Sequence, residues 1–283
     1  MPVDVLFDAP LGRVAVFFVI WLLIWLPVAI PMAIALRWRP FRPSAPNQKL
    51  PLLAGLYLLG PAVLGWVNHQ SGQTFAENGL PLGRSLVTAG LMGLGIGIVG
   101  IGMLYGLRSR LSHVSRQTVQ MVWAIARQQW LAIVGLLVLA LWVGITEELI
   151  FRGFVQTQFQ SVWPRWLAAA IASLIFAVLH LVWDGAGSVP QLPGLWLMGM
   201  VLTVARVVDD GSIGLAWGLH AGWVWGVAMA DTVTAALPDS EEWRDRSPLP
   251  DWLVGIGGHP LAGLLGLGLL VGTGGVLYFT GGW

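Results

Sequence analysis

The sequence contains no cysteine and few charged residues, which make up 10% of its 283 positions. The absence of cysteine excludes disulfide bonds, thiolate metal sites and a cysteine nucleophile. Soluble domains carry about 25% charged residues, so this chain has too few charges to cover a surface that faces water. A net charge of +1 gives no support for nucleic-acid binding. With 56% hydrophobic residues, the remaining class is a protein that crosses a membrane several times.

Long apolar runs account for most of the chain. A helix needs about 20 apolar residues to cross the hydrocarbon core of a bilayer, and the runs are continuous rather than alternating, which excludes a membrane β-barrel. We therefore predict an all-α, polytopic membrane helix bundle of about eight transmembrane helices, with residues 1–283 forming a single membrane domain. The predicted spans are 14–36, 50–67, 86–107, 131–151, 163–182, 192–208, 212–237 and 253–279.

Basic residues are concentrated in two loops, 37–49 and 108–127. Short loops rich in Lys and Arg stay on the cytoplasmic side of a membrane, so we expect both loops to be cytoplasmic and the N-terminus to lie outside. The first run lacks the basic flank and cleavage site of a signal peptide, and we interpret it as a retained span. We expect a multi-pass protein of the plasma (inner) membrane, or of an equivalent internal membrane, in contact with membrane lipid.

Only a few ionisable residues stand out inside the apolar runs. A charge at the bilayer centre costs about 2.5–3.5 kcal/mol on insertion scales, so each such residue is a candidate functional residue. The candidates are Glu147, Glu148 and Arg152 near the end of the fourth run, His180 in the fifth, and His220 in the seventh, with Asp231 nearer the end of that run.

The adjacent glutamates lie in the segment TEELIFRG. On an α-helix Glu148 and Arg152 are four residues apart and share a face, whereas Glu147 points about 100° away. We therefore expect Arg152 to neutralise Glu148 and to leave Glu147 free, in low-dielectric surroundings, as a general base. The alternative is an ion-paired helix end at the membrane surface, although a structural role would need only one carboxylate for one arginine.

The two histidines are ambiguous when each is considered alone. His180 has Phe176 four residues before it and Asp184 four residues after it, and Asp184 is a hydrogen-bond partner for the imidazole if the helix continues. His220 lies opposite a ladder of glycines that recurs every four residues and permits close helix packing. Either histidine could simply be a hydrogen-bonded polar residue.

Together, one glutamate and two histidines on three spans can converge in a helix bundle. Glu147, His180 and His220 could then activate a water molecule directly, or through a divalent metal such as zinc that all three hold. Both arrangements suit hydrolysis of an amide inside or near the membrane.

Three motifs, on the fourth, fifth and seventh runs, resemble those of the CAAX-protease and bacteriocin-processing family. EELIFRG at 147–153 resembles its EExxxR motif, FAVLH at 176–180 its FxxxH motif, and GLHAGWVW at 218–225 its third, His-centred motif. The resemblance covers about residues 131–236, which we interpret as the family core. It implies a membrane bundle of about eight spans and a protease similar to type II CAAX prenyl endopeptidases, which cleave behind a prenylated cysteine.

The resemblance also implies a role for each matching residue. Glu147 would activate the water with help from His180, and Glu148 would complete the first motif with Arg152. His220 would bind the substrate carbonyl or stabilise the oxyanion, and Phe176 belongs to the second motif. The family has been described both as metal-dependent, which implies zinc, and as glutamate-dependent without a cofactor, and both alternatives stay open.

One position departs from the family pattern. The third motif of prenyl endopeptidases is HxxxN, and here Val224 stands in place of the asparagine. An oxyanion donor of this kind contributes about 10²–10³ in rate, which leaves His220 or Trp225 as substitutes. The predicted function is an intramembrane endopeptidase that acts on a peptide or a prenylated protein. The alternatives are a non-proteolytic membrane scaffold or assembly factor on the same fold and, with less support, a proton or ion transporter.

Overall fold

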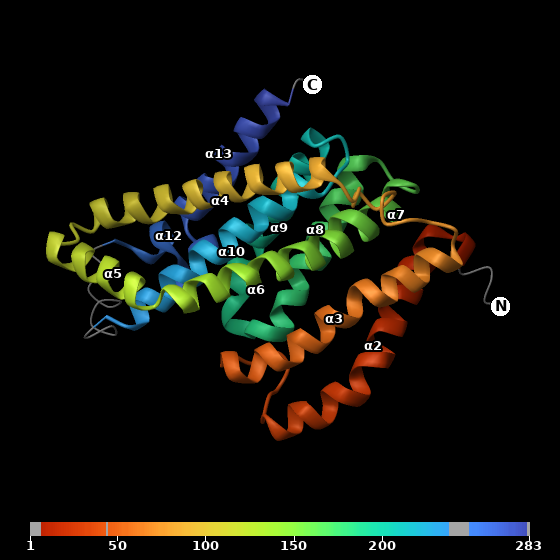
Figure 1. Cartoon of the computed structure of the whole chain (residues 1–283), viewed down its shortest axis with the longest axis horizontal. Coiled ribbons are helices and arrows are strands. Elements are labelled where there is room, and N and C mark those ends of the chain that lie inside the picture. Colours follow the sequence, from red (N-terminus) through yellow and green to blue (C-terminus); the bar gives the residue numbers. More distant parts are fainter. Residues whose placement is uncertain (1–6, 44, 238–248, 282–283) are drawn as a thin grey trace.

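The computed structural model describes residues 7–43, 45–237 and 249–281, and these form a bundle of helices with no β-strand (Figure 1). Six helices are long and apolar enough to cross a membrane, which confirms the predicted all-α, polytopic class. The described helices and helical turns are α2 (Pro10–Ala35), α3 (Pro46–Gln70), α4 (Arg84–Leu111), α5 (Arg116–Gln128), α6 (Trp130–Glu148), η1 (Leu149–Val155), α7 (Gln156–Gln160), α8 (Arg165–Asp184), η2 (Ala186–Gln191), α9 (Leu192–Val208), α10 (Gly214–Ala235), α12 (Asp251–Val254), η3 (Ile256–Gly258), η4 (Pro260–Ala262) and α13 (Leu264–Thr280).

The helices agree roughly with the eight predicted spans. The six membrane-crossing candidates correspond to the first six runs. The seventh run forms α10, a helix of 22 residues that is rich in glycine and tryptophan and is largely buried. The eighth run is shorter than predicted, because three helical turns precede α13, which begins only at Leu264 and has 17 residues.

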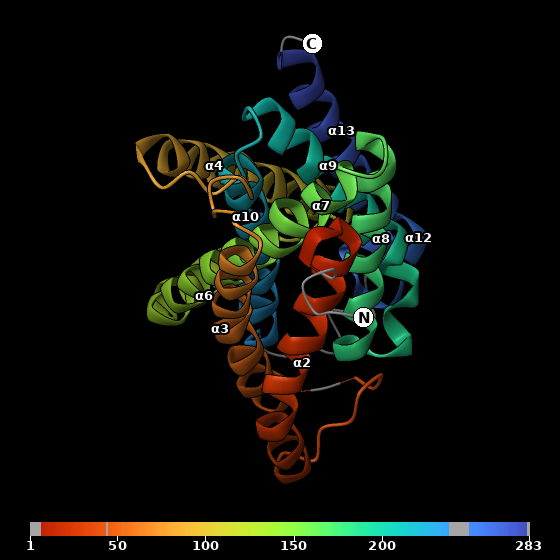
Figure 2. The same cartoon turned by 90° about the vertical axis from the view of Figure 1, so that its right-hand side faces the viewer.

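Helix α10 lies at the centre of the bundle, between α4 and α6, as Figures 1 and 2 both show. Its glycines allow the backbones of α10 and α4 to touch. A Cβ atom placed on Gly222 would lie 2.8 Å from the carbonyl oxygen of Leu94, and one on Gly97 would lie 2.8 Å from that of Leu219. This is the close helix approach that the glycine ladder predicts.

Helices α6, η1 and α7 form one continuous helix, and η1 is a π-helical segment within it. Every residue of η1 is buried. The wider turn brings this helix against the loop before α4, since a Cβ atom on Gly153 would lie 2.5 Å from the carbonyl oxygen of Asn78. π-Helical turns inside α-helices occur frequently at functional sites, and this one begins directly after the paired glutamates.

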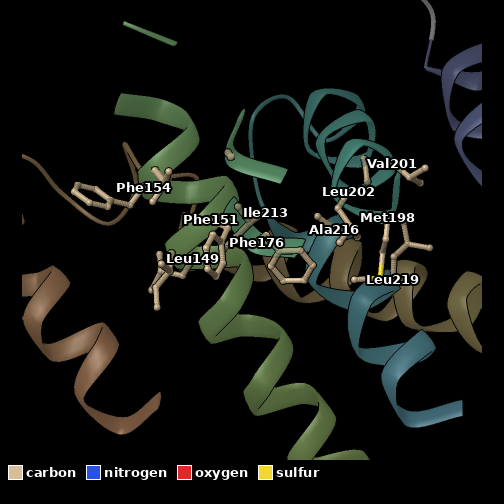
Figure 3. Close-up of a cluster of buried hydrophobic side chains, with 14 of the residues drawn as sticks. Leu149, Phe151, Phe154, Phe176, Met198, Val201, Leu202, Ile213, Ala216 and Leu219 are labelled. Atoms are coloured by element: carbon tan, nitrogen blue, oxygen red, sulfur yellow. The ribbon is translucent and has the colours of Figure 1, made fainter. Parts of the chain in front are cut away.

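The main apolar core joins η1 to α8, α9 and α10 (Figure 3). Phe151 of η1 and Phe176 of α8 pack edge to face, with 5.3 Å between ring centroids. Both rings point into the layer that contains Leu202 of α9 and Leu219 of α10. Burial of such side chains stabilises the fold by about 1.5–3 kcal/mol each, and it fixes the faces of α8 and α10 that carry the histidines.

Helices α2 and α3 pack together on one side of the bundle (Figure 2). Two tryptophans of α2 donate indole hydrogen bonds across this contact, Trp21 to the Leu56 carbonyl at 2.8 Å and Trp25 to the Leu52 carbonyl at 3.2 Å. Helix α3 in turn contacts α6 and η1. The α2–α3 pair therefore places one face of α3 beside the glutamates.

Candidate active site

Polar side chains from three helices, namely the continuous α6–η1 helix, α10 and α3, meet inside the bundle next to the start of η1. Glu147 and Glu148 end α6, Arg152 lies on η1, His220 lies on α10, and Tyr57 reaches them from α3. The exposed fractions are 7% for Glu147, 0% for Glu148, 1% for Arg152 and 2% for His220. Charged side chains are almost never buried to this extent unless they are paired.

Glu148 is held by two donors. Arg152 Nη1 lies 3.1 Å from its Oε1 atom, in the ion pair that the four-residue spacing predicts. His220 donates from Nδ1 to the same oxygen at 2.7 Å. A carboxylate with two charge-assisted donors is fixed in orientation, so Glu148 is placed to position other groups.

Glu147 does not contact Arg152, as expected, but it is not free. Its Oε2 atom lies 3.4 Å from His220 Nε2, and its Oε1 atom accepts a hydrogen bond from the Tyr57 hydroxyl. The two ring nitrogens of His220 therefore face the two adjacent carboxylates. Glu147 is also the more exposed of the two glutamates.

His180 lies on α8, next to this cluster, and is partly buried. Its Nδ1 atom lies 2.8 Å from the Phe176 carbonyl oxygen. A carbonyl oxygen only accepts, so Nδ1 carries the proton and a neutral ring keeps its lone pair on Nε2. The expected hydrogen bond from His180 to Asp184 is wrong, because Asp184 instead pairs with Lys49 at 2.5 Å and ties the end of α8 to the start of α3.

The ring of Phe176 lies at the centre of the charged groups. Its centroid is 4.6 Å from that of His180, 6.0 Å from that of His220, and 4.4 Å from Arg152 Cζ. A guanidinium over an aromatic face gains a cation–π interaction. Phe176 thus separates the two histidines and covers Arg152.

Two atoms of the buried ion pair have no hydrogen-bond partner among the described residues, namely Glu148 Oε2 and Arg152 Nη2. Leaving a buried polar group unpaired costs about 1–3 kcal/mol, and more for a charged group. An ion pair with a purely structural role would be more stable if both atoms had hydrogen-bond partners. Unpaired buried polar atoms of this kind are typical of a functional site.

Two residues of this region were missed by the sequence reasoning. Tyr57, one of three tyrosines in the chain, contacts Glu147. Arg206 of α9 donates to the Arg152 carbonyl oxygen, and also to Thr157 Oγ1 at 2.9 Å, and thereby supports the π-helical backbone. Both lie within predicted spans, so a search for every phenol and every charge inside an apolar run would have identified them.

The described donors do not fit the zinc ion that a metal-dependent reading requires. His220 Nδ1 is held by Glu148 at 2.7 Å, which leaves Nε2, 3.4 Å from Glu147 Oε2, as the ring nitrogen that could bind a metal. Within the described ranges, no group of three His, Asp or Glu side chains is arranged to hold a metal ion.

The position of the missing asparagine offers no donor. Val224 is apolar, and the indole of Trp225 donates to the Ile133 carbonyl at 2.9 Å. Trp225 is therefore engaged and does not replace the asparagine. The nitrogens of His220 also face carboxylates, and among the described residues the hydroxyl of Tyr57 is a further donor that contacts Glu147.

Comparisons with known proteins agree with the motifs. Residues 128–226 match the family model described as Rce1-like, type II CAAX prenyl endopeptidase. An uncharacterized 24.3 kDa protein of Escherichia coli is 33% identical over 81 residues, which cover 28% of this chain and 36% of that protein. No solved structure matches.

The matched segment begins just before α6 and extends into α10, so it contains all three motifs and the π-helical turn. Helices α2 and α3, the second of which carries Tyr57, lie outside it. The resemblance predicted from EELIFRG, FAVLH and GLHAGWVW is confirmed for this segment, which is similar to the Rce1-like, type II CAAX prenyl endopeptidase family model and lies within an integral membrane protein.

Proposed function

We propose that this protein is an intramembrane endopeptidase in which Glu147 activates the water that hydrolyses a peptide bond. The observation that carries the proposal is that the two adjacent carboxylates differ in burial and in hydrogen-bond partners. Arg152 and His220 hold Glu148 at 0% exposure, whereas Glu147 is the more exposed of the two and contacts a hydroxyl and an imidazole. Two carboxylates in such different surroundings suit different roles.

In the proposed reaction, a water molecule transfers one proton to Glu147 while its oxygen attacks the carbonyl carbon of the scissile bond. Glu147 then returns that proton to the leaving nitrogen as the carbon–nitrogen bond breaks, which yields a carboxylic acid and an amine. His180 accepts a hydrogen bond from the attacking water through Nε2, because its Nδ1 proton is bound by the Phe176 carbonyl. Positioning by His220 and Glu148 keeps Glu147 in place.

The negative charge that develops on the carbonyl oxygen requires a donor. We assign this role to the Tyr57 hydroxyl, which contacts Glu147 before substrate binds and which can turn toward a carbonyl oxygen placed beside it. The assignment gives His220 a positioning role instead of the carbonyl-binding role that the family resemblance implies, since both of its nitrogens already face carboxylates.

The proposed substrate is a peptide segment that reaches the site within the membrane, with or without a prenyl group. We place the protein in the plasma (inner) membrane or an equivalent internal membrane. The basic loops 37–49 and 108–127 support a cytoplasmic orientation for the ends of the helices that they join.

The proposal is tested with the full chain in liposomes, by mass spectrometry of a farnesylated CAAX peptide and of the same peptide without the lipid. Glu147→Gln should lower the rate by about 10²–10⁴, the range for loss of a general base, and Glu77→Gln, in the loop before α4, should leave it unchanged. Assays with a chelator and with added zinc distinguish a metal-dependent enzyme. Full activity of Glu147→Gln would contradict the proposal.

Val224 supports a second candidate, a membrane scaffold or assembly factor that keeps the polar cluster for structure. Under this alternative neither peptide is cleaved, and the same proteins co-purify with the unaltered chain and with Glu147→Gln. Loss of those partners in Glu147→Gln, together with cleavage by the unaltered chain, would contradict it.

A further inference from the structure

The amphipathic helix α5 takes no part in the site described above. It runs from Arg116 to Gln128 and connects the ends of α4 and α6 at one end of the molecule (Figure 1). Ser115 caps it by accepting a hydrogen bond from the Thr118 backbone nitrogen at 3.1 Å. A side-chain cap of this kind contributes about 1 kcal/mol, so the helix has its own defined start.

The length of α4 places α5 at the membrane surface. The 28 residues of α4 extend about 42 Å at 1.5 Å per residue, whereas the hydrocarbon core is about 30 Å thick. The apolar run ends at Leu107, so we expect the turns that carry Arg108 and Arg110 to be the part of α4 that extends into the layer of lipid headgroups. Helix α5 follows after a four-residue turn and leads back to Trp130, where α6 begins.

One face of α5 packs against the bundle, and the opposite face is exposed. Thr118 is buried against the bundle, and Val122 and Ile125 on the same side are partly buried, where α5 packs on α10 and α6. The opposite face presents Arg116, Gln120, Trp123 and Arg127, spaced by three or four residues. Trp123 is 64% exposed, and a shallow hollow is lined by Gln120, Trp123, Ala124 and Arg127.

The sequence between Glu77 and Glu147 carries charge of one sign, although Asp231 of α10 lies near Tyr105 at this end of α4. No acidic residue occurs between Glu77 and Glu147, whereas Arg108, Arg110, Arg116 and Arg127 lie within 20 positions of one another. A tryptophan flanked by arginines matches the membrane interface, where the indole lies at headgroup level and guanidinium groups bind phosphate. An acidic protein segment would satisfy the arginines but would leave Trp123 in water.

We propose that the outer face of α5, formed by Arg116, Gln120, Trp123 and Arg127, binds the headgroups of anionic phospholipids. Arg116 and Arg127 contact the phosphates, and Trp123 inserts between them at the boundary of the acyl chains. The contact holds the ends of α4 and α6 at a fixed depth in the membrane. Because Glu147 and Glu148 end α6, the depth of α5 influences the depth of the candidate site.

The absence of cysteine allows a direct test. Ala124→Cys, on the rim of the hollow, carries a nitroxide label in the full chain, and its collision rates with oxygen and with a water-soluble nickel chelate report its depth. The label should lie deeper in vesicles that contain phosphatidylglycerol than in vesicles of phosphatidylcholine alone. High salt should reduce the difference, because it screens exposed charges.

The phosphatidylglycerol content that gives half of the depth change should be about fivefold higher for Arg127→Gln than for the unaltered chain. This is the factor expected when a basic residue that contributes about 1 kcal/mol to binding at an anionic surface is lost. The matched control is Arg84→Gln, an exposed arginine at the opposite end of α4, which should change nothing. Equal depth in both kinds of vesicle would overturn the proposal.

A different partner would give a different result. The acidic residues Asp239, Glu241, Glu242 and Asp245 of this chain lie outside the described residues. If the label is shielded from the nickel chelate in phosphatidylcholine vesicles, and changing these four residues to their amides exposes it, the partner is this acidic segment and the lipid assignment is wrong.

Discussion

The two faces of α10 show two ways to bring helices together in this bundle. On one face, Gly218 and Gly222 let the backbone of α4 approach to contact distance. On the other face, His220 connects α10 to α6 through the two glutamates. The first contact consists of backbone atoms without charge, and the second consists of buried ionisable groups.

The difference between these faces lies in what each contact tolerates. The glycine face depends on the absence of side-chain atoms, so it is sensitive to added volume. The histidine face depends on each charge keeping its partner, so it is sensitive to removal of a single group. Shape complementarity therefore supports the scaffold, whereas pairing of charges supports the site.

The largest effect is expected from breaking the charged face. Arg152→Ala leaves Glu148 buried with a single donor, and loss of one partner of a buried pair destabilises by about 3–5 kcal/mol. Unfolding in a denaturing detergent measures the change. The double variant Arg152→Ala, Glu148→Gln should recover part of the loss, because the unpaired charge is gone. A single variant as stable as the unaltered chain would show that the pair contributes nothing to folding.

A comparable effect, on rate instead of stability, is expected at Tyr57. Tyr57→Phe removes only the hydroxyl, and if that group donates to the carbonyl oxygen, kcat should fall by about 10²–10³ with little change in KM. Tyr105→Phe, on α4 and away from the glutamates, is the control. If KM rises and kcat stays constant, Tyr57 acts in substrate binding and the oxyanion role is wrong.

A smaller effect is expected from the glycine face. Gly222→Val places new atoms against the backbone of α4, which should cost about 1–3 kcal/mol. Gly102→Val is the matched control, because a Cβ atom at this position of α4 meets nothing within 4 Å. Equal stability of both variants would show that α4 and α10 separate without cost.

Much of the fold follows from the sequence, because each apolar run is long enough to indicate a helix by itself. The run 86–107 corresponds to α4, and the run 192–208 coincides with α9. The interruption before α13 is also visible in the sequence at His259 and Pro260. The hydrophobic pattern of one helix does not show which other helices pack against it. The contact of α3 with the glutamates was therefore not predicted.

The site was predicted in part for the same reason. The Glu148–Arg152 pair depends on local spacing along one helix, and the structure contains it. The contacts of Tyr57 with Glu147 and of Asp184 with Lys49 join distant segments, and no local pattern specifies them. Local reasoning therefore paired His180 with Asp184, its neighbour one turn away, whereas α3 supplies the actual partner of Asp184.

The π-helical segment η1 changes the directions in which the side chains that follow the first motif point. In α6 each residue turns the chain by about 100°, but a π-helical turn holds more residues, because its hydrogen bonds span five positions instead of four. The π-helical segment therefore shifts the helical register of α7 relative to that of α6, although the helix continues without interruption from one to the other. Side chains of α7, such as Gln156 beside Thr203 of α9, face directions that an unbroken α-helix starting at Trp130 would not give them.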